Sequence, residues 1–440
     1  MNILNIPSYR LRGIYKNFLS FFSIFSTQTI IQILYPPAMI FAWGIENFGI
    51  WILLTSIPSI LTILNINFSS ASRSEMSIFY EKKKLTHVNK IFQNTFCLIL
   101  LSSLLFFLIW VTIFSLDKID FKTLENIDVE NFKIIFLFLV LSSHCLIIDQ
   151  IFYCGITYKG DTSKYNYNVL IYDILIKIII PFLGLFTNNL IYASLILFIL
   201  SICKTFCLFI LFKYQNKNNF NLKTNLFDTK LCIKLFKLSF SYQLDNISHI
   251  IRNNGLIILV GSFFSPIIVG LISTSRTLFY FLPIRFLDVI NSTLFFEFSK
   301  MYGRRDLSLS KVFFKYHILA NIFMMIVFSI LSVIFGKFIY DFWTNNKYDL
   351  STSLMIIIIA DAVVFNLFNS LEIFIKSINK FLYSASLKAF LSILTIFLSY
   401  ALFAFGYTLH SYFILNIISS FIILIFILFI TYRIFNKYYK

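Results

Sequence analysis

Long apolar runs follow one another along almost the whole chain, separated by short polar segments. Most runs exceed the roughly 20 residues that a helix needs to cross the hydrocarbon core of a membrane. The pattern predicts twelve membrane helices, near residues 18–41, 48–72, 88–116, 132–157, 167–186, 190–212, 238–261, 267–298, 312–336, 352–375, 387–408 and 411–432. No segment between them is long enough to fold as a separate domain. The expected fold is that of an all-α, polytopic membrane protein.

Lysine and arginine gather in alternate polar segments. These basic segments are the N-terminal tail and residues 73–90, 158–166, 213–237, 299–311, 376–386 and 433–440. The segments between them hold few basic residues, and residues 117–131 are acidic. Because cytoplasmic loops carry the excess of Lys and Arg, we expect both termini to lie in the cytoplasm.

Composition narrows the class of protein further. Apolar residues make up 58% and charged residues 13% of the chain, whereas charged residues reach about 25% in soluble domains. The basic loops explain the net charge of +17, so we expect no nucleic-acid partner, although the N-terminal arm suits anionic lipid headgroups. The six cysteines show neither a disulfide nor a zinc spacing, and there is no Walker motif. We expect no catalytic residue, resident metal or cofactor.

The two halves of the chain share a signature. Residues 75–92 read EMSIFYEKKKLTHVNKIF and residues 297–314 read EFSKMYGRRDLSLSKVFF, which aligns Glu75 with Glu297 without a gap. The copies follow the second and the eighth predicted helix. An offset of six helices keeps the orientation, which predicts two six-helix lobes related by a parallel repeat. The expected lobes are residues 1–212 and 238–440, joined by a basic cytoplasmic linker at 213–237.

Several charged residues fall inside the predicted helices, although a charge at the bilayer centre costs roughly 2.5–3.5 kcal/mol. The cations are Lys177, Lys204, Arg252, Arg276 and Arg285, and the acids are Asp149, Asp173, Asp245, Asp288, Asp361 and Glu372. These groups must pair, line a watery cavity or lie near an interface. Asp173 with Lys177, and Arg285 with Asp288, share a helix face and are expected to pair.

The predicted helix 238–261 carries a polar stripe. Asp245, His249 and Arg252 recur at positions i, i+4 and i+7, so they share one face. Gly255 follows about one turn later, where the backbone could open. The stripe is either an internal salt bridge or the wall of a water-filled cavity, and the sequence leaves both interpretations open.

Arg276 has no acid three or four residues away on its own helix. It therefore needs a watery lumen, a partner on another helix or a bound anion. Arg285 lies about half a turn round the same helix, so both face one lumen only if Pro283 bends the span. Near the cytoplasmic helix ends, Glu75 and Glu297 either pair with nearby basic residues and hold a gate, or remain solvated.

Four short segments carry a resemblance to a known family. Residues 46–68, ENFGIWILLTSIPSILTILNINF, continue into SSASRSEMS; residues 276–278 read RTL; and residues 297–303 contain EFS followed by YG. These look like the second helix, the RTL motif and the PE-x-S…G turn of bacterial polysaccharide transporters in the MOP exporter superfamily, especially Wzx-like flippases of O-antigen units. The chain departs from that family at Phe296, where Pro is frequent, and at residues 254–255, where Gln-Gly is frequent.

The resemblance implies a MATE-like fold and a transporter rather than an enzyme. It implies that undecaprenyl-diphosphate-linked oligosaccharides, such as O-antigen units of lipopolysaccharide, are flipped to the periplasmic leaflet of the bacterial inner membrane by alternating access. Membrane lipids, a polysaccharide polymerase and chain-length proteins are the further partners that it implies. Because arginine suits phosphate, the candidates for binding the anionic headgroup are Arg252, Arg276, His249, Arg285 and Lys177. The candidates for gating or ion coupling are Asp245, Asp288, Glu75, Glu297 and Asp361.

Two other functions remain open. A cation-coupled, MATE-like exporter of small molecules would use acids such as Asp149, Asp245 and Asp361. A membrane polysaccharide polymerase is less favoured, because its expected large periplasmic loop is missing from the sequence.

Overall fold

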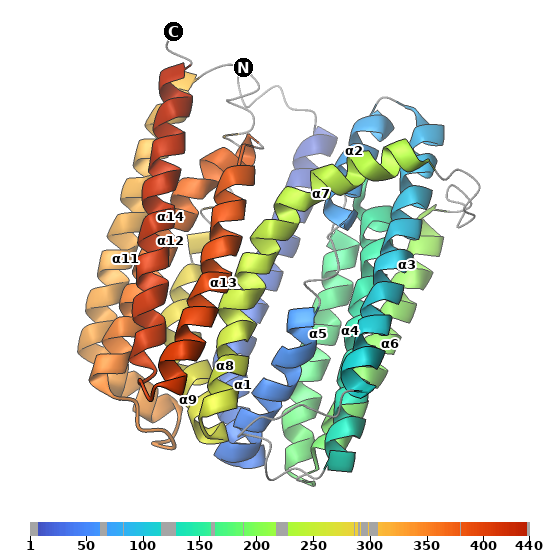
Figure 1. Cartoon of the computed structure of the whole chain (residues 1–440). Coiled ribbons are helices and arrows are strands. Elements are labelled where there is room, and N and C mark those ends of the chain that lie inside the picture. Colours follow the sequence, from blue (N-terminus) through green and yellow to red (C-terminus); the bar gives the residue numbers. More distant parts are fainter. Residues whose placement is uncertain are drawn as a thin grey trace. The chain divides into compact units, whose positions relative to one another are not determined.

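The computed structural model is built from helices, as the apolar runs predict (Figure 1). It describes residues 8–61, 68–81, 83–115, 129–159, 163–187, 189–216, 228–285, 287–288, 291, 298, 307–378 and 380–437. The helices are α1 (Ser8–Leu61), α2 (Phe68–Glu81), α3 (Leu85–Ser115), α4 (Val129–Thr157), α5 (Ser163–Gly184), α6 (Leu190–Asn216), α7 (Thr229–Ile250), α8 (Leu256–Phe263), α9 (Pro266–Arg276), α11 (Leu307–Trp343), α12 (Thr352–Ser377), α13 (Leu382–Ala404) and α14 (His410–Lys437). Two π-helical turns, η4 (Ile251–Gly255) and η5 (Thr277–Phe281), follow α7 and α9.

The first helix combines two predicted spans. α1 is kinked at Gly44, whose φ of 77° and ψ of 169° lie outside the helical region. Glycine tolerates a positive φ because it has no Cβ. The predicted helix 18–41 is therefore the first arm of α1, while the prediction 48–72 covers its second arm and the start of α2.

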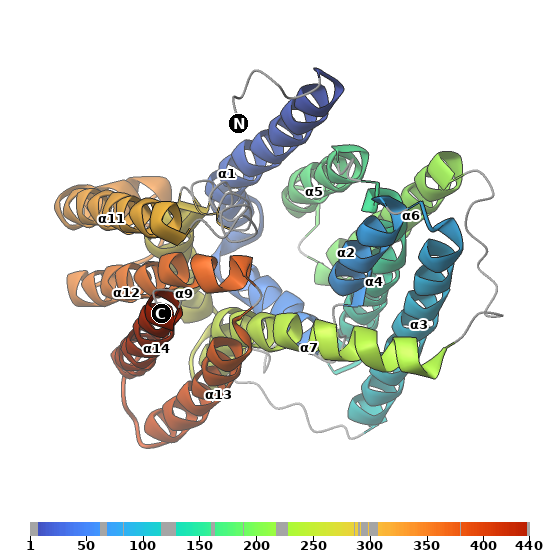
Figure 2. The same cartoon turned by 90° about the horizontal axis from the view of Figure 1, so that it is seen from above.

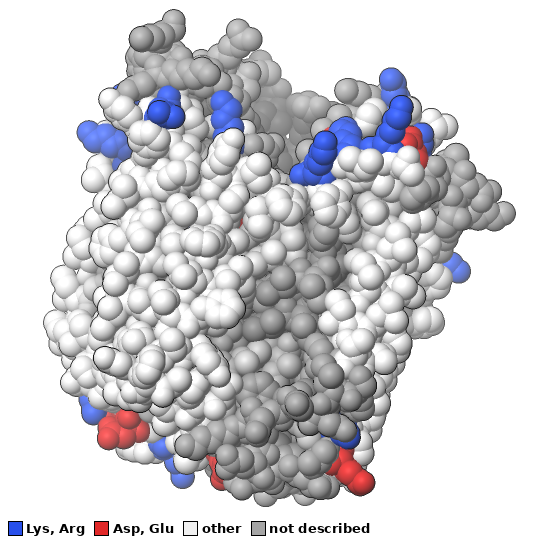
Figure 3. Space-filling view, in the orientation of Figure 1, with Lys and Arg blue, Asp and Glu red and all other residues white. Residues whose placement is uncertain are grey.

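Among the described residues, ten helices are long and apolar enough to cross a membrane. In that count the two arms of α1 form one span, and the continuous segment of α7, η4 and α8 is not included. Counting the two arms of α1 separately and adding this segment gives the twelve predicted spans. On the visible face of each unit in Figure 3, charged side chains lie mainly near the helix ends, with uncharged residues between. The protein is a multi-pass membrane protein.

The chain divides into two compact units. Unit 1 contains Met1–Asn47, Leu54–Asp120 and Leu124–Gln243, whereas unit 2 contains Leu244–Lys440 together with Phe48–Leu53 from α1. Gly49 in this short segment lies against the backbone of Pro266 at the start of α9, so that a Cβ atom would meet the Pro266 carbonyl. Close backbone packing explains why a piece of α1 belongs to unit 2.

The two units repeat the same internal packing. In unit 1, Phe212 of α6 packs against Phe92 of α3 and Phe152 of α4, with ring centroids 5.3 and 5.8 Å away. In unit 2, Phe435 of α14 packs against Phe314 and Phe374, at 5.7 and 4.7 Å, although here the ring of α12 rather than that of α11 is the stacked one. Phe92 and Phe314 are aligned in the duplicated signature.

The helix pairs agree with this correspondence. α4 packs along α6 in unit 1, as α12 packs along α14 in unit 2 (Figures 1 and 2). The two units therefore repeat one helix packing, as the duplicated signature predicts.

Candidate functional site

The polar stripe of α7 runs into a widened turn of helix. Asp245 and His249 lie on α7, and Arg252 lies in the π-helical turn η4, which ends at Gly255. The backbone therefore opens near the glycine that the sequence singled out. π-Turns shift the register of backbone hydrogen bonds and are frequent at functional sites. This turn presents the Asn253 carbonyl to a side chain from another element.

Arg252 is ion-paired inside unit 2. Its Nη2 donates to Asp361 Oδ1 of α12 at 2.5 Å, and its Nη1 donates to Ser420 Oγ of α14 at 3.0 Å. The Arg252 side chain is 6% exposed and that of Asp361 is 1% exposed. Asn416 of α14 donates to the second oxygen of Asp361 at 3.4 Å. The pair thus joins η4 to α12 and α14.

Arg276 lies beside this pair but binds different partners. Its Nη2 and Nη1 donate to Asn253 Oδ1 and to the Asn253 carbonyl at 2.8 and 3.2 Å. Its guanidinium carbon lies 5.1 Å from the ring centroid of Tyr280 and 4.9 Å from that of Phe281. In the described part of the chain, no carboxylate lies within ion-pair distance of Arg276. Of the three outcomes that the sequence allowed for Arg276, the structure provides a partner on another element.

The ring of Tyr280 connects the two arginines. The Arg252 guanidinium carbon lies 4.5 Å from the Phe365 ring centroid and 5.6 Å from that of Tyr280. Cation–π contacts of this kind stabilise a guanidinium where water is excluded. The inner cluster of Arg252, Arg276 and Asp361 therefore keeps one positive charge that no described carboxylate neutralises.

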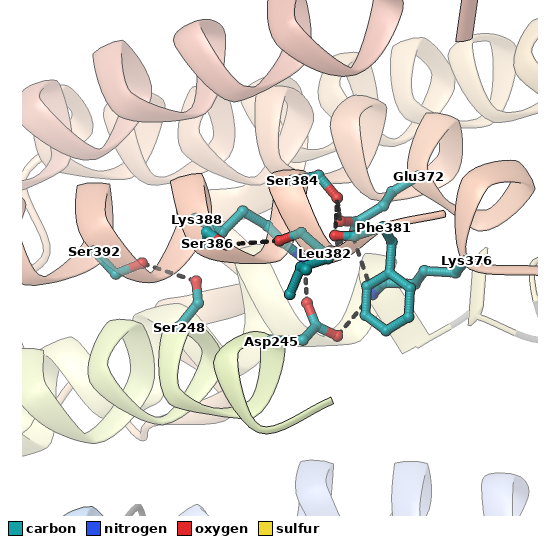
Figure 4. Close-up of polar contacts among 10 residues, drawn as sticks. All are labelled: Asp245, Ser248, Glu372, Lys376, Phe381, Leu382, Ser384, Ser386, Lys388 and Ser392. Atoms are coloured by element: carbon teal, nitrogen blue, oxygen red, sulfur yellow. Dashed lines mark hydrogen bonds and ion pairs between the residues drawn. The ribbon is translucent and has the colours of Figure 1, made fainter. Parts of the chain in front are cut away.

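A second network lies at the other end of the stripe (Figure 4). Lys376 binds Asp245 at 2.8 Å and Glu372 at 3.0 Å, and Lys388 binds Glu372 at 2.7 Å and also contacts the other oxygen of Asp245. Ser384 donates to Glu372 Oε1 at 2.8 Å. The two negative charges of Asp245 and Glu372 equal the two positive charges of Lys376 and Lys388. This outer network therefore joins α7, α12 and α13 without a net charge.

His249 lies on the stripe between the two groups. Its ring is half-buried and meets the edge of Phe365 with centroids 6.0 Å apart. We call the inner cluster, the outer network and His249 together the ionic core of unit 2. The stripe is thus an internal network of salt bridges over most of its length.

Sequence reasoning did not single out two cations of the ionic core. Lys376 stands at the end of a predicted span, and Lys388 stands in the first turn of the predicted helix 387–408. Lys376 falls in the basic segment 376–386 of the sequence analysis, yet α12 extends to Ser377, and Lys388 lies inside α13, which begins at Leu382. Glu372 is the sequence signal that indicates Lys376 as its partner, because this buried acid lies four residues before Lys376 on the same helix.

The remaining candidates lie elsewhere. Lys177 of α5 places its ammonium 3.8 Å from the ring centroid of Tyr35, and within the described residues it forms no ion pair with Asp173. Arg285 is exposed and Asp288 is half-buried, and the expected ion pair between them does not form among the described residues. Glu75 of α2 binds Lys234 of α7 at 2.7 Å, inside unit 1. Glu297 lies outside the described residues.

Comparison with solved structures relates this arrangement to known transporters. Over 97% of this chain and 90% of the other, the protein superimposes on the lipid II flippase MurJ with a TM-score of 0.65 and 17% identity. It matches a MOP superfamily transporter from Pyrococcus furiosus over 97% of this chain and 96% of the other, with a TM-score of 0.62 and 13% identity. The chain has the fold of the MOP superfamily transporters.

A multidrug MATE family transporter of the same superfamily is similar too, with a TM-score of 0.61, 12% identity and coverage of 94% of this chain and 95% of the other. No protein-family model matches the sequence, and no curated protein matches it significantly. The predicted MATE-like fold is therefore confirmed from structure, at identities too low to transfer a function.

Proposed function

We propose that the protein flips a lipid-linked oligosaccharide with a diphosphate headgroup across the bacterial inner membrane, and that undecaprenyl-diphosphate-linked repeat units are its substrate. The fold supports a transporter, because the similar solved structures are transporters and flippases. The sequence resemblance to Wzx-like flippases gives the substrate class.

Arg276 is the observation that carries this proposal. It is a cation 3% exposed within unit 2, and its described partners are the neutral Asn253 and aromatic rings. A buried charge of this kind is costly and is retained in membrane proteins mainly where it functions. A diphosphate would supply the missing negative charge, and binding it would replace the hydrogen bonds from Arg276 to Asn253.

The acids support a flippase over a cation-coupled exporter. Asp149 binds Lys204 at 3.0 Å, Asp361 binds Arg252 at 2.5 Å and Asp245 binds Lys376 at 2.8 Å. A carboxylate that is already neutralised by an internal lysine or arginine gains little from a coupling ion. Each acid that a cation-coupled exporter would use is therefore already paired with a lysine or an arginine.

The substitution Asn253→Asp tests the proposal sharply. It would place a carboxylate where Asn253 Oδ1 now accepts from Arg276 at 2.8 Å, so the shape is kept while the free positive charge is neutralised. In vesicles that contain lipid-linked oligosaccharides, we expect flipping to fall by about tenfold or more, with thermal stability unchanged or raised. Asn254→Asp, at the adjacent position of η4, is the matched control.

Arg276→Gln complements this experiment. It removes the charge and keeps a donor, and it should also reduce flipping. If both Asn253→Asp and Arg276→Gln flip lipid-linked oligosaccharides at the wild-type rate, Arg276 is not part of the substrate site. If the wild-type protein flips none of these lipids and instead drives efflux of small molecules along an ion gradient, the exporter is the correct function.

A further inference from the structure

A cleft of about 340 Å³ opens within unit 1 between α2, α4, α5 and α6. Its walls are formed by Ser69, Leu146, Asp149, Gln150, Tyr153, Tyr165 and Lys204. The volume is at the small end of ligand pockets, which run from about 300 to 1,000 Å³. The cleft thus has room for one small ligand, and it is separate from the ionic core of unit 2.

The charged walls of the cleft are held in place by their own partners. Asp149 binds Lys204 at 3.0 Å and accepts a hydrogen bond from Thr205 at 2.7 Å. Arg73 of α2 donates to the Tyr153 hydroxyl at 2.6 Å. Because the acid and the base in the wall neutralise each other, a strongly charged ligand gains little here. A neutral ligand with several hydroxyls fits better, because carboxylate, amide and ammonium groups can all bind hydroxyls.

Gln150 and the two tyrosines add to this chemistry. The Gln150 Oε1 atom is buried and accepts no hydrogen bond from the described residues. A buried acceptor without a donor costs roughly 1–3 kcal/mol, so a ligand hydroxyl would be stabilising there. Tyr153 and Tyr165 meet edge to face, with ring centroids 4.8 Å apart and planes at 65°. Aromatic surface beside polar hydrogen-bonding groups suits the mixed faces of a sugar ring.

The internal repeat shows why the cleft is open. The offset that relates Phe152 to Phe374 also relates Gln150 to Glu372. In unit 2, Lys376, Lys388 and Ser384 bind Glu372 and saturate its oxygens. In unit 1, the equivalent Gln150 faces a cleft. Protein side chains thus satisfy this position in one lobe and leave it to a ligand in the other.

We propose that the cleft of unit 1 binds one sugar residue of the transported glycan. Gln150 and Asp149 accept hydrogen bonds from the sugar hydroxyls, and Tyr165 packs against the ring. This assignment rests on the proposed function, and it gives the glycan a binding site of its own that recognises hydroxyls rather than phosphate.

Binding of two lipids to the purified, full-length protein tests the assignment. One is the undecaprenyl-diphosphate-linked oligosaccharide extracted from host cells, and the other is undecaprenyl diphosphate without sugar. We expect Gln150→Leu and Tyr165→Leu to weaken binding of the first lipid about tenfold and to leave the second unchanged. Tyr167→Leu is the matched control, because Tyr167 lies on the same helix, is 41% exposed and does not line the cleft. Circular dichroism and thermal unfolding check that each variant is folded.

The possible outcomes separate this inference from the proposed function. If the protein binds both lipids but Gln150→Leu and Tyr165→Leu change neither affinity, the sugar site is wrong and the flippase stands. If the protein binds neither lipid, the proposed function is wrong. Saturation-transfer NMR with glucose, galactose, N-acetylglucosamine, N-acetylgalactosamine, rhamnose and glucuronic acid then decides the sugar site. A signal that Gln150→Leu abolishes supports the site, and the lack of any signal overturns it.

Discussion

Arg252 donates a hydrogen bond to Asp361 at 2.5 Å, and neither side chain is more than 6% exposed. The two residues come from η4 and α12, far apart in the sequence, and they lie on helices that the apolar pattern treats as independent spans. Their pairing is therefore a tertiary contact that fixes α12 against the opened turn after α7.

Removing one member of this pair should strongly destabilise the protein. Asp361→Ala leaves the Arg252 guanidinium buried without a carboxylate, and breaking a buried pair costs about 3–5 kcal/mol. We expect a clear drop in the thermal unfolding midpoint in detergent. The double variant Arg252→Met with Asp361→Leu should lose less stability than Asp361→Ala alone, because no charge remains unpaired.

An exposed pair provides the control for this prediction. Lys337 and Asp349 lie 3.7 Å apart, and the Asp349 side chain is 98% exposed. Exposed pairs contribute about 0–1 kcal/mol, so Asp349→Ala should leave the midpoint almost unchanged. Equal effects of Asp361→Ala and Asp349→Ala would contradict the structural role of the buried pair.

The start of α7 should be sensitive to acid. Asp228 accepts hydrogen bonds from the backbone of Lys230 and Leu231 at 2.9 and 3.3 Å, and binds Lys90 at 2.8 Å. The bond to Lys90, followed by these backbone bonds, lowers the pKa of Asp228 below its ordinary value of 3.8. Since a lowered pKa stabilises the folded form only while the carboxylate is charged, protection of the first turn should be full above about pH 4 and fall as the pH drops through the lowered pKa.

Hydrogen exchange at several labelling pH values, corrected for intrinsic rates, measures this effect. Asp228→Asn should keep a cap but lose the pH dependence, while Asp228→Ala should expose the first turn of α7 at every pH. Protection in the wild-type protein that does not change as the pH falls would contradict the role of the Asp228 carboxylate.

The sequence predicted the fold better than it predicted the site. The helix spans follow from the long apolar runs and the repeat from the duplicated signature, and both can be read directly from the chain. Phe92 and Phe314, which are aligned in that signature, make equivalent aromatic contacts in the two units. The partners of the charges depend on tertiary packing. Asp361 and Arg252 are 109 residues apart in the sequence, and no sequence pattern indicates that they pair.

Local spacing also misled in one place. Asp173 and Lys177 share a helix face, yet the Lys177 ammonium lies over the Tyr35 ring of α1. An ion pair between residues four apart on a helix contributes only a few tenths of a kcal/mol. A cation–π contact with an aromatic ring of a neighbouring helix can therefore replace it. Lys388 was missed for the opposite reason, because its acids lie on α7 and α12 and only the fold brings them near.

The outer network predicts a rescue experiment. Lys388→Met should destabilise the protein, because Asp245 and Glu372 would then share only Lys376. Adding Glu372→Gln removes the excess negative charge, so part of the stability should return. Coupled residues show interaction energies of about 0.5–3 kcal/mol, and a double-mutant cycle by thermal or denaturant unfolding measures this coupling. Additive effects of the two substitutions would show that Lys388 and Glu372 act independently.

Two glycines of α1 should respond differently to alanine, although they are five residues apart. At Gly49 the new Cβ would overlap the backbone carbonyl of Pro266, which cannot move without shifting α9. At Gly44 nothing lies within 4 Å, and the cost is that of a φ of +77° combined with a ψ of 169°, a region essentially restricted to glycine that costs about 1–3 kcal/mol for another residue. We expect Gly49→Ala to lower the yield of folded protein sharply and Gly44→Ala to lower the unfolding midpoint modestly.

The effect of Gly261→Ala on folding should be intermediate. Its Cβ would approach the Leu53 side chain at 2.6 Å, and a side chain repacks more easily than a backbone carbonyl. Size-exclusion profiles of the three variants at matched expression test this order, and a Gly49→Ala protein as stable as Gly44→Ala would contradict the close packing of α1 on α9.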